Sequence, residues 1–270
     1  MEFYYDEVKF IGIGETGASA LKYFCDVGND ILPERLLIFD KDDIADSWEK
    51  VSDYIADCEW LFVITDIEHL EVAETLVKGV EEQKNSLIFP SVTILTLCPS
   101  ATNVRLADIP ENFGTWIILP EDKIVETSLT RNELIYRAVN MTTSIIPIMK
   151  KRDNLIGMDF ADVVGTIGNC GRACIGFGES LDAENNSLQA VKNALKSSLF
   201  IEDIRKAKKA LLVFFGNYEF LLMLEMNEAA NFLYDELRQS EDNYVLWQVD
   251  PDESAADGVA AFVLATDFIK

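Results

Sequence analysis

Two acidic residues, Asp159 and Asp162, lie three positions apart directly before a short apolar segment. Carboxylates placed in this way can take part in general acid–base chemistry. The same spacing also suits a helix start, where one acid caps free N–H groups and the other complements the helix dipole. The residue types alone therefore leave a catalytic and a structural interpretation open, and the structural one is the more common use of such a pair.

A second group with chemical potential is the pattern Gly12-x-Gly14-x-x-Gly17, which follows an apolar, β-rich run and precedes a helical stretch. Glycines there allow close backbone approach to a phosphate, and a helix N-terminus offers free N–H groups to its charge. Asp40 ends the next expected strand at a spacing suited to a ribose hydroxyl. The pattern thus predicts dinucleotide binding, with NAD or FAD as the ligand, or close strand–helix packing without a ligand.

Two residues inside this loop, Glu15 and Thr16, bear on the phosphate. A carboxylate is repelled by a phosphate at 4 Å by roughly 1 kcal/mol in bulk water and about four times more near a protein surface. Glu15 therefore weakens phosphate binding unless it points outward or holds a cation.

The elements that must position these residues alternate between strands and helices. Short runs rich in β-branched and aromatic residues predict five strands, and the intervening periodicity predicts helices over 18–27 and 69–83. Such alternation indicates a Rossmann-like, mostly parallel sheet covered on both faces. The expected strands are 8–14, 36–40, 60–65, 92–97 and 115–119.

The second half of the chain predicts a smaller α/β domain behind a central connecting helix. Apolar spacing favours a long helix over 126–149, and further helices over 160–175, 183–198 and 227–238. Strands are expected at 211–215, 220–225, 244–249 and 259–264. The predicted organisation is a first domain over 1–125, a connecting helix over 126–153 and a second domain over 154–270.

The string Asp159-Phe-Ala-Asp162-Val resembles the synergy loop of the FtsZ/tubulin family, which reads N-x-D-F-A-D-V. Other stretches are similar to family motifs: 117–125 to I-x-I-P-N-D-K-L-L, 211–215 to V-L-V-N-I and 263–267 to V-V-A-T-G. The resemblance implies an FtsZ/tubulin fold, GTP or GDP with Mg²⁺ as the ligand, and a head-to-tail partner, either itself or another FtsZ-like protein. It implies that Asp159 and Asp162 act in trans on that partner's nucleotide.

The chain departs from the family at the loops that hold the nucleotide. The family's G-G-G-T-G-T-G loop is replaced by residues 65–71, Thr-Asp-Ile-Glu-His-Leu-Glu, which contain no glycine. We expect these acids to cap the following helix, and His69 to be a surface or interface residue. At the guanine site an acid persists at Glu133, but the family's aromatic ring is lost.

These departures predict a cytoskeletal or cell-division scaffold whose GTP binding and hydrolysis are weak or lost, and which we do not expect to be an enzyme in its own right. Two alternatives stay open: a dinucleotide-binding Rossmann protein and a still-active divergent GTPase.

Composition limits the remaining functions. Acids outnumber Lys and Arg by 47 to 23, and the formal charge of −24 would repel nucleic acids and anionic lipids. Five cysteines, odd in number, argue against a disulfide framework, and the single histidine argues against a zinc site. The chain ends at Lys270, without the tail by which the family reaches membrane tethers. We therefore expect a soluble, cytoplasmic protein with no metal site of its own and no direct membrane contact.

Overall fold

The computed structural model describes most of the helices and strands of the chain. The described residues are 8–27, 36–39, 48–56, 58, 60–82, 91–98, 114–127, 129–143, 160–168, 170–181, 186–237, 242–251 and 258–268. The chain divides into two compact units. Unit 1 comprises residues 1–125, 129–139 and 168–171, and unit 2 comprises 126–128, 140–167 and 172–270.

Unit 1 contains a five-stranded parallel sheet in the order β2-β1-β3-β4-β5. Its strands are β1 (Val8–Ile13), β2 (Leu36–Phe39), β3 (Trp60–Asp66), β4 (Ser91–Cys98) and β5 (Thr115–Pro120). Its helices are α1 (Gly14–Val27), α2 (Trp48–Ile55), α3 (Leu70–Glu82) after a 3₁₀ turn at Ile67–His69, α4 (Glu121–Ile124) and most of α5 (Arg131–Thr143).

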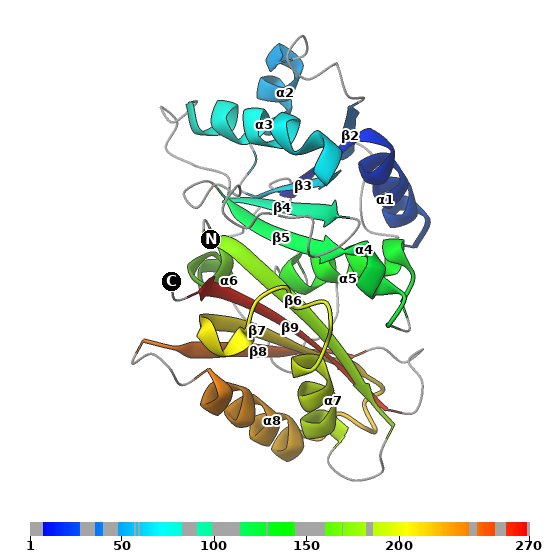
Figure 1. The fold of residues 1–270 in the computed structure, drawn as a ribbon, viewed down its shortest axis with the longest axis vertical. Coiled ribbons are helices and arrows are strands. Elements are labelled where there is room, and N and C mark those ends of the chain that lie inside the picture. Colours follow the sequence, from blue (N-terminus) through cyan, green and yellow to red (C-terminus); the bar gives the residue numbers. More distant parts are fainter. Residues whose placement is uncertain are drawn as a thin grey trace. The chain divides into compact units, whose positions relative to one another are not determined.

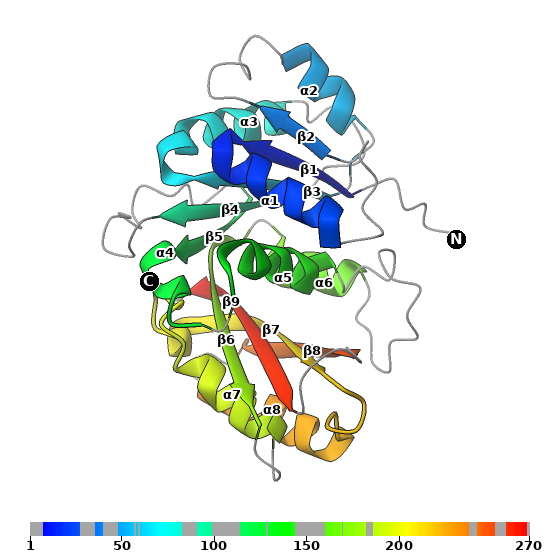
Figure 2. The ribbon, with the colours of Figure 1, turned by 90° about the vertical axis from the view of Figure 1, so that its right-hand side faces the viewer.

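The helices of unit 1 cover both faces of this sheet. The chain moves outward from β1 to β2 in one direction and from β3 to β4 in the other. Because crossovers between parallel strands are right-handed, α1 and α3 fall on opposite faces, as Figures 1 and 2 show. Residues 60–65 are all buried, as expected of a parallel strand between two helical layers.

Unit 2 contains four strands in the order β6-β9-β7-β8, with only the β7–β8 pair parallel. They are β6 (Gly171–Ser180), β7 (Ala207–Gly216), β8 (Tyr244–Pro251) and β9 (Val259–Phe268). Helices α7 (Asn186–Leu195) and α8 (Met223–Glu236) lie on one face of this sheet, and α6 (Phe160–Ile167) lies on the other (Figure 1). Alternate residues of β7, namely Ala210, Leu212 and Phe214, join the core beneath α7 and α8.

The mixed α/β fold with a mostly parallel sheet is confirmed, but three predicted elements of the second half are corrected. The helix expected over 160–175 ends at Ile167, and residues 171–180 form strand β6. Glycine explains the strand: a Cβ on Gly178 would lie 2.1 Å from the backbone N of Ala194. The bare backbone of β6 thus lets α7 pack directly on it, whereas glycine in a helix interior would cost about 1 kcal/mol relative to alanine.

The strand expected over 220–225 is also wrong. Phe220 closes a turn by donating its N–H to the Asn217 carbonyl at 2.9 Å, and α8 begins at Met223. The Asn217 side chain accepts from Glu219 N, an Asx turn that breaks the apolar run. The third correction is the start of the long helix, which is Arg131 rather than Glu126.

Candidate functional site

The glycine loop lies where the strand order of unit 1 reverses. Gly14 follows β1, and Asp66 ends the neighbouring parallel strand β3. In open α/β sheets ligands bind outside the carboxyl ends of the strands at such a reversal. The β1–α1 and β3–α3 junctions are therefore the place at which to test the predicted phosphate loop.

Gly12 and Gly17 are required by packing within unit 1. A Cβ on Gly12 would lie 2.7 Å from the carbonyl carbon of Gly17. A Cβ on Gly17 would lie 2.6 Å from the carbonyl oxygen of Ile64 in β3. These two glycines hold α1 against β1 and β3, which accounts for them without any ligand.

Gly14 has a different environment, because its neighbour is an imidazole. Its φ of +67° is in the left-handed region. A Cβ there would lie 2.7 Å from His69 Cε1. The His69 side chain is 13% exposed, so it is partly buried against the glycine loop. The ring covers the first residue of α1.

Asp66 holds that ring in place. Its Oδ1 lies 2.6 Å from His69 Nδ1 and also accepts a hydrogen bond from Glu68 N at 3.2 Å. Asp66 is thus the N-cap of the 3₁₀ turn at Ile67–His69. The expectation that the acids of residues 65–71 cap the following helical segment is confirmed for Asp66.

Arg131, at the start of α5, contacts the first turn of α1. Its Nη2 donates to Thr16 Oγ1 at 2.6 Å, and its Nε lies 2.9 Å from Glu121 Oε1. Thr16 itself is 6% exposed. Next to Arg131, the Asn132 amide donates to Ser19 Oγ at 3.2 Å. These contacts bind α5 to the first turns of α1.

Glu133, the predicted acid of the base site, closes a capping box. Its Oε2 accepts from Thr130 N at 2.7 Å, and the Thr130 hydroxyl accepts from Glu133 N at 3.3 Å. Hydrogen bonds from the backbone and then the side chain of Thr130 hold the pKa of Glu133 below its ordinary value. The carboxylate is therefore already engaged by its own helix.

Four predicted site residues remain. Asp162 is exposed in the first turn of α6, and its carbonyl accepts from the Thr166 hydroxyl at 2.8 Å. Glu15 is exposed at the start of α1. Asp159 and Asp40 lie outside the described residues.

The electrostatic character of the loop region is dominated by acids. The guanidinium of Arg131 is paired with Glu121, and the His69 ring with Asp66. Further carboxylates are carried by Glu15 and Glu68. A polyphosphate placed at the start of α1 would therefore meet the helix dipole on one side and several acids on the other.

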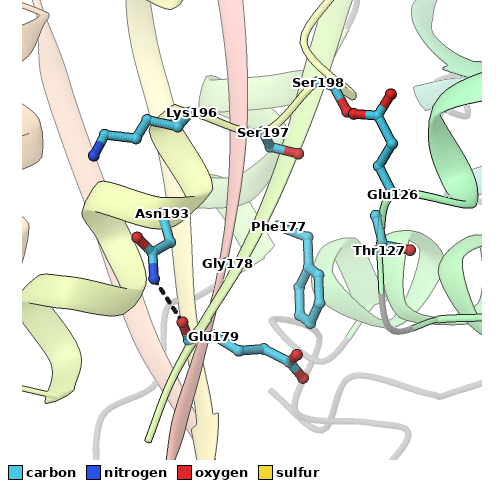
Figure 3. A pocket seen from close by; sticks show the side chains of 9 residues that line it. All are labelled: Glu126, Thr127, Phe177, Gly178, Glu179, Asn193, Lys196, Ser197 and Ser198. Carbon is cyan, nitrogen blue, oxygen red and sulfur yellow. Dashed lines mark hydrogen bonds between the residues drawn. The ribbon is translucent and has the colours of Figure 1, made fainter. Parts of the chain in front are cut away.

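Unit 2 contains a polar pocket of about 340 Å³ between β6 and the end of α7 (Figure 3). The Asn193 amide donates to the Glu179 carbonyl at 2.7 Å, and the Lys196 side chain points away from Phe177. None of the predicted site residues lines it; those that do are Glu126, Thr127, Phe177, Gly178, Glu179, Asn193, Lys196, Ser197 and Ser198.

Within the described ranges there is no group of His, Cys, Asp and Glu side chains suited to a metal ion. All five cysteines lie in described segments, and none forms a disulfide. Among the described helices, none combines the length and the apolar character needed to cross a bilayer.

Sequence reasoning did not predict the contacts that His69 and Arg131 make with the glycine loop. Arg131 contacts Thr16 across 115 positions of sequence, so nothing local signals the pair. The capping box is different, because Thr130-x-x-Glu133 before an apolar run is a recognisable helix-start signature.

Comparisons with known proteins agree with this architecture. Residues 171–269 match the C-terminal domain of the FtsZ family. Cell division protein FtsZ 2 of Thermococcus kodakarensis is 36% identical over 158 residues, which cover 58% of this chain and 36% of that protein. The chain spans less than half the length of the curated relatives it matches.

Solved structures share the fold over almost the whole chain. A point mutant of FtsZ from M. jannaschii has a TM-score of 0.74 at 18% identity, covering 97% of this chain and 91% of that one. CetZ2 from Haloferax volcanii, solved as a GTPγS-bound protofilament, has a TM-score of 0.66 at 16% identity, covering 97% and 94%.

Proposed function

Because this chain is an FtsZ/tubulin-superfamily protein, we propose that it is a cytoskeletal or cell-division scaffold that assembles with itself or with an FtsZ-like partner. We further propose that its own glycine loop binds and hydrolyses GTP weakly or not at all. The assembly is proposed to be cytoplasmic, in keeping with cysteines that form no disulfide.

One observation carries the loss of nucleotide binding: the chain's own side chains occupy the surroundings of the glycine loop. The His69 ring lies against Gly14, and Asp66 fixes it there. The Arg131 guanidinium takes the Thr16 hydroxyl. A phosphate group would have to displace the ring and compete with Glu121 for Arg131, and it would gain no glycine-rich second loop in return.

Assembly is supported by the features that the chain keeps. Asp162 is exposed at the start of α6, where a neighbouring subunit can reach it. A heterologous contact between copies that does not close produces an open filament. Protofilaments are the state of two structural relatives, CetZ2 from Haloferax volcanii and TubZ from Bacillus thuringiensis.

The proposed role of Asp159 and Asp162 is to act on the nucleotide of a partner. The test is to mix the chain with a GTP-hydrolysing FtsZ and to measure GTP turnover and co-sedimentation together. We expect the chain to pellet with FtsZ filaments and to change their turnover, and the D159A/D162A variant to pellet equally without changing it. A chain that stays in the supernatant at all concentrations, alone and with FtsZ, would contradict the scaffold function.

A still-active GTPase is the second candidate, and the observation that favours it is Asp162, an acid exposed in the first turn of α6. GTP turnover by the chain alone that disappears in Asp162→Ala would support this candidate. The family assignment favours either function over the dinucleotide alternative.

A further inference from the structure

Unit 2 carries a groove between α7 and α8 with a volume of about 450 Å³. Its floor is apolar, formed by Leu195, Phe200, Ile204 and Phe232. The Phe200 ring is seated over Gly176, where a Cβ would lie 2.2 Å from the ring. The floor is therefore a fixed surface rather than a set of loose side chains.

The rim of this groove carries three basic and three acidic side chains, in a chain whose acids otherwise outnumber its basic residues. Residues 186–209 contain six Lys or Arg against two acids, whereas the remainder of the chain contains 17 against 45. Lys192 and Lys196 line the groove, and the Lys192 ammonium lies 5.3 Å from the centre of the Phe232 ring. Arg205 turns to Asp203 in a bidentate pair, and Glu202 pairs with Arg172. The remaining charges of the rim are Lys192, Lys196 and Glu236.

The same unit exposes an apolar knob at the other end of α8. The knob consists of Tyr218, Leu222, Met223 and Leu224, whose exposed fractions are 46%, 51%, 49% and 85%. Three consecutive exposed apolar residues are unusual on a monomer and indicate a contact surface.

The start of α8 also lacks the polar side chain that usually caps an exposed helix end. Leu222 is its N-cap and makes no side-chain capping hydrogen bond, whereas Ser, Thr, Asp or Asn would stabilise the helix by about 1 kcal/mol. Acids surround the knob: Glu219 follows Tyr218, and Glu228 lies one turn after Leu224 on the same helix face.

The groove and the knob match in polarity and charge: an apolar floor whose rim carries two lysines and one glutamate, and an apolar projection flanked by glutamates. We propose that the knob of one copy of this chain docks into the groove of a second copy. The contact lies wholly in unit 2 and requires no nucleotide, so it goes beyond the function proposed for the glycine loop and for Asp159 and Asp162.

The two surfaces lie toward opposite ends of α8, since the knob includes Met223 and the groove includes Phe232 and Glu236. One copy can therefore present its knob while its own groove is filled. This is a heterologous contact, which links copies in series rather than in a closed pair. Four apolar side chains form a small interface of the weak class, below about 1,200 Å².

The experiment is sedimentation velocity of the full chain without nucleotide, over concentrations up to about 200 µM, where weak contacts become visible. We expect wild-type association to weaken at least about 10-fold in K192E/K196E and in E219K/E228K, because each variant places like charges across the contact. The control K22E/K78E makes the same change of charge on two exposed lysines of unit 1 and should associate like the wild type.

The decisive measurement is made on a mixture of the two charge variants, K192E/K196E and E219K/E228K. Each alone opposes like charges, but in the mixture every knob faces a groove of opposite charge, so association should return. Restored association cannot come from unfolding of either variant. Three results would each overturn the proposal. They are a wild type that stays monomeric over this range, a control variant that associates as weakly as K192E/K196E, and a mixture whose association does not return. The D159A/D162A variant should retain this contact, which separates its outcome from that of the proposed function.

Discussion

Single side chains decide what the glycine loop can hold. The residues that the sequence offers for phosphate binding are present, but His69, Asp66 and Arg131 surround them with contacts internal to the chain. An imidazole against Gly14 makes that glycine a packing position as well as a conformational one. Replacing Gly14 should therefore lower the free energy of unfolding even where no nucleotide is bound.

Replacing Gly14 by alanine should destabilise unit 1 by about 1–3 kcal/mol, because the left-handed backbone and the contact with His69 both oppose a Cβ. Urea unfolding measures the effect. The matched control is Gly165→Ala in α6, where a Cβ meets nothing within 4 Å. That change should be neutral or stabilise the helix by up to about 1 kcal/mol; equal losses in the two variants would contradict the role given to Gly14.

Glu133 should make stability depend on pH. Thr130 lowers the pKa of Glu133 in the folded state, so its contribution is present above the unfolded value of about 4.3 and is lost as the pH falls through the folded value. The difference in unfolding free energy between wild type and E133Q should be visible at pH 7 and should vanish in acid. A difference that persists below the folded pKa would contradict the capping-box assignment.

The contacts of single side chains could be predicted from the sequence only where the two partners are close in sequence. Asp66 caps the segment that follows it, as expected, and Thr130-x-x-Glu133 could have been found by its spacing. The contact of His69 with Gly14 and that of Arg131 with Thr16 join distant segments. The position of His69 against Gly14 therefore had no signal in the sequence around it.

At the scale of elements, apolar periodicity located the strands of unit 1 well because each is a continuous buried run between helices. It failed at β6, whose glycines serve the approach of α7. It failed again at 220–225, where five successive apolar residues suit a strand but a turn at Asn217 redirects the chain into α8. In both places the deciding interaction comes from backbone packing or turn chemistry rather than from hydrophobic spacing.

The start of α8 offers a test of element stability. Replacing Leu222 by serine supplies the missing N-cap, so the variant should unfold at a free energy about 0.5–1 kcal/mol higher than the wild type. Leu224→Ser removes similar apolar surface from the knob but lies past the cap position, and it should bring no such gain. Thermal or urea unfolding of both variants measures the difference, and equal behaviour would show that capping is not limiting at this helix.

At the scale of the whole molecule, the chain keeps the family fold. Its own side chains occupy the surroundings of the glycine loop, where the family binds its nucleotide. The fold follows from the alternation of strands and helices, which many unrelated activities share, so it says little about the nucleotide. The proposed assembly through Asp162 of α6 and through the knob and groove of unit 2 requires only exposed, complementary surfaces. The proposed scaffold function therefore does not require GTP binding by this chain.

Opening the site provides a gain-of-function prediction. In the variant D66G/H69G/E121Q, the ring and two carboxylates beside the loop are removed, so GTP affinity should rise at least about 10-fold over the wild type. The charge control is D53N, which replaces an exposed acid on α2 by an uncharged amide. Circular dichroism establishes that the variant is folded before its binding is measured by calorimetry.

The chain is proposed to assemble without a nucleotide of its own. The most direct test is calorimetric titration of the purified chain with GTP, with and without Mg²⁺, combined with sedimentation of the same samples. We expect no saturable binding up to about 1 mM GTP, equivalent to less than about 4 kcal/mol of binding free energy, and sedimentation that is the same in all samples. Saturable GTP binding at micromolar concentration, with assembly that appears only in its presence, would contradict it.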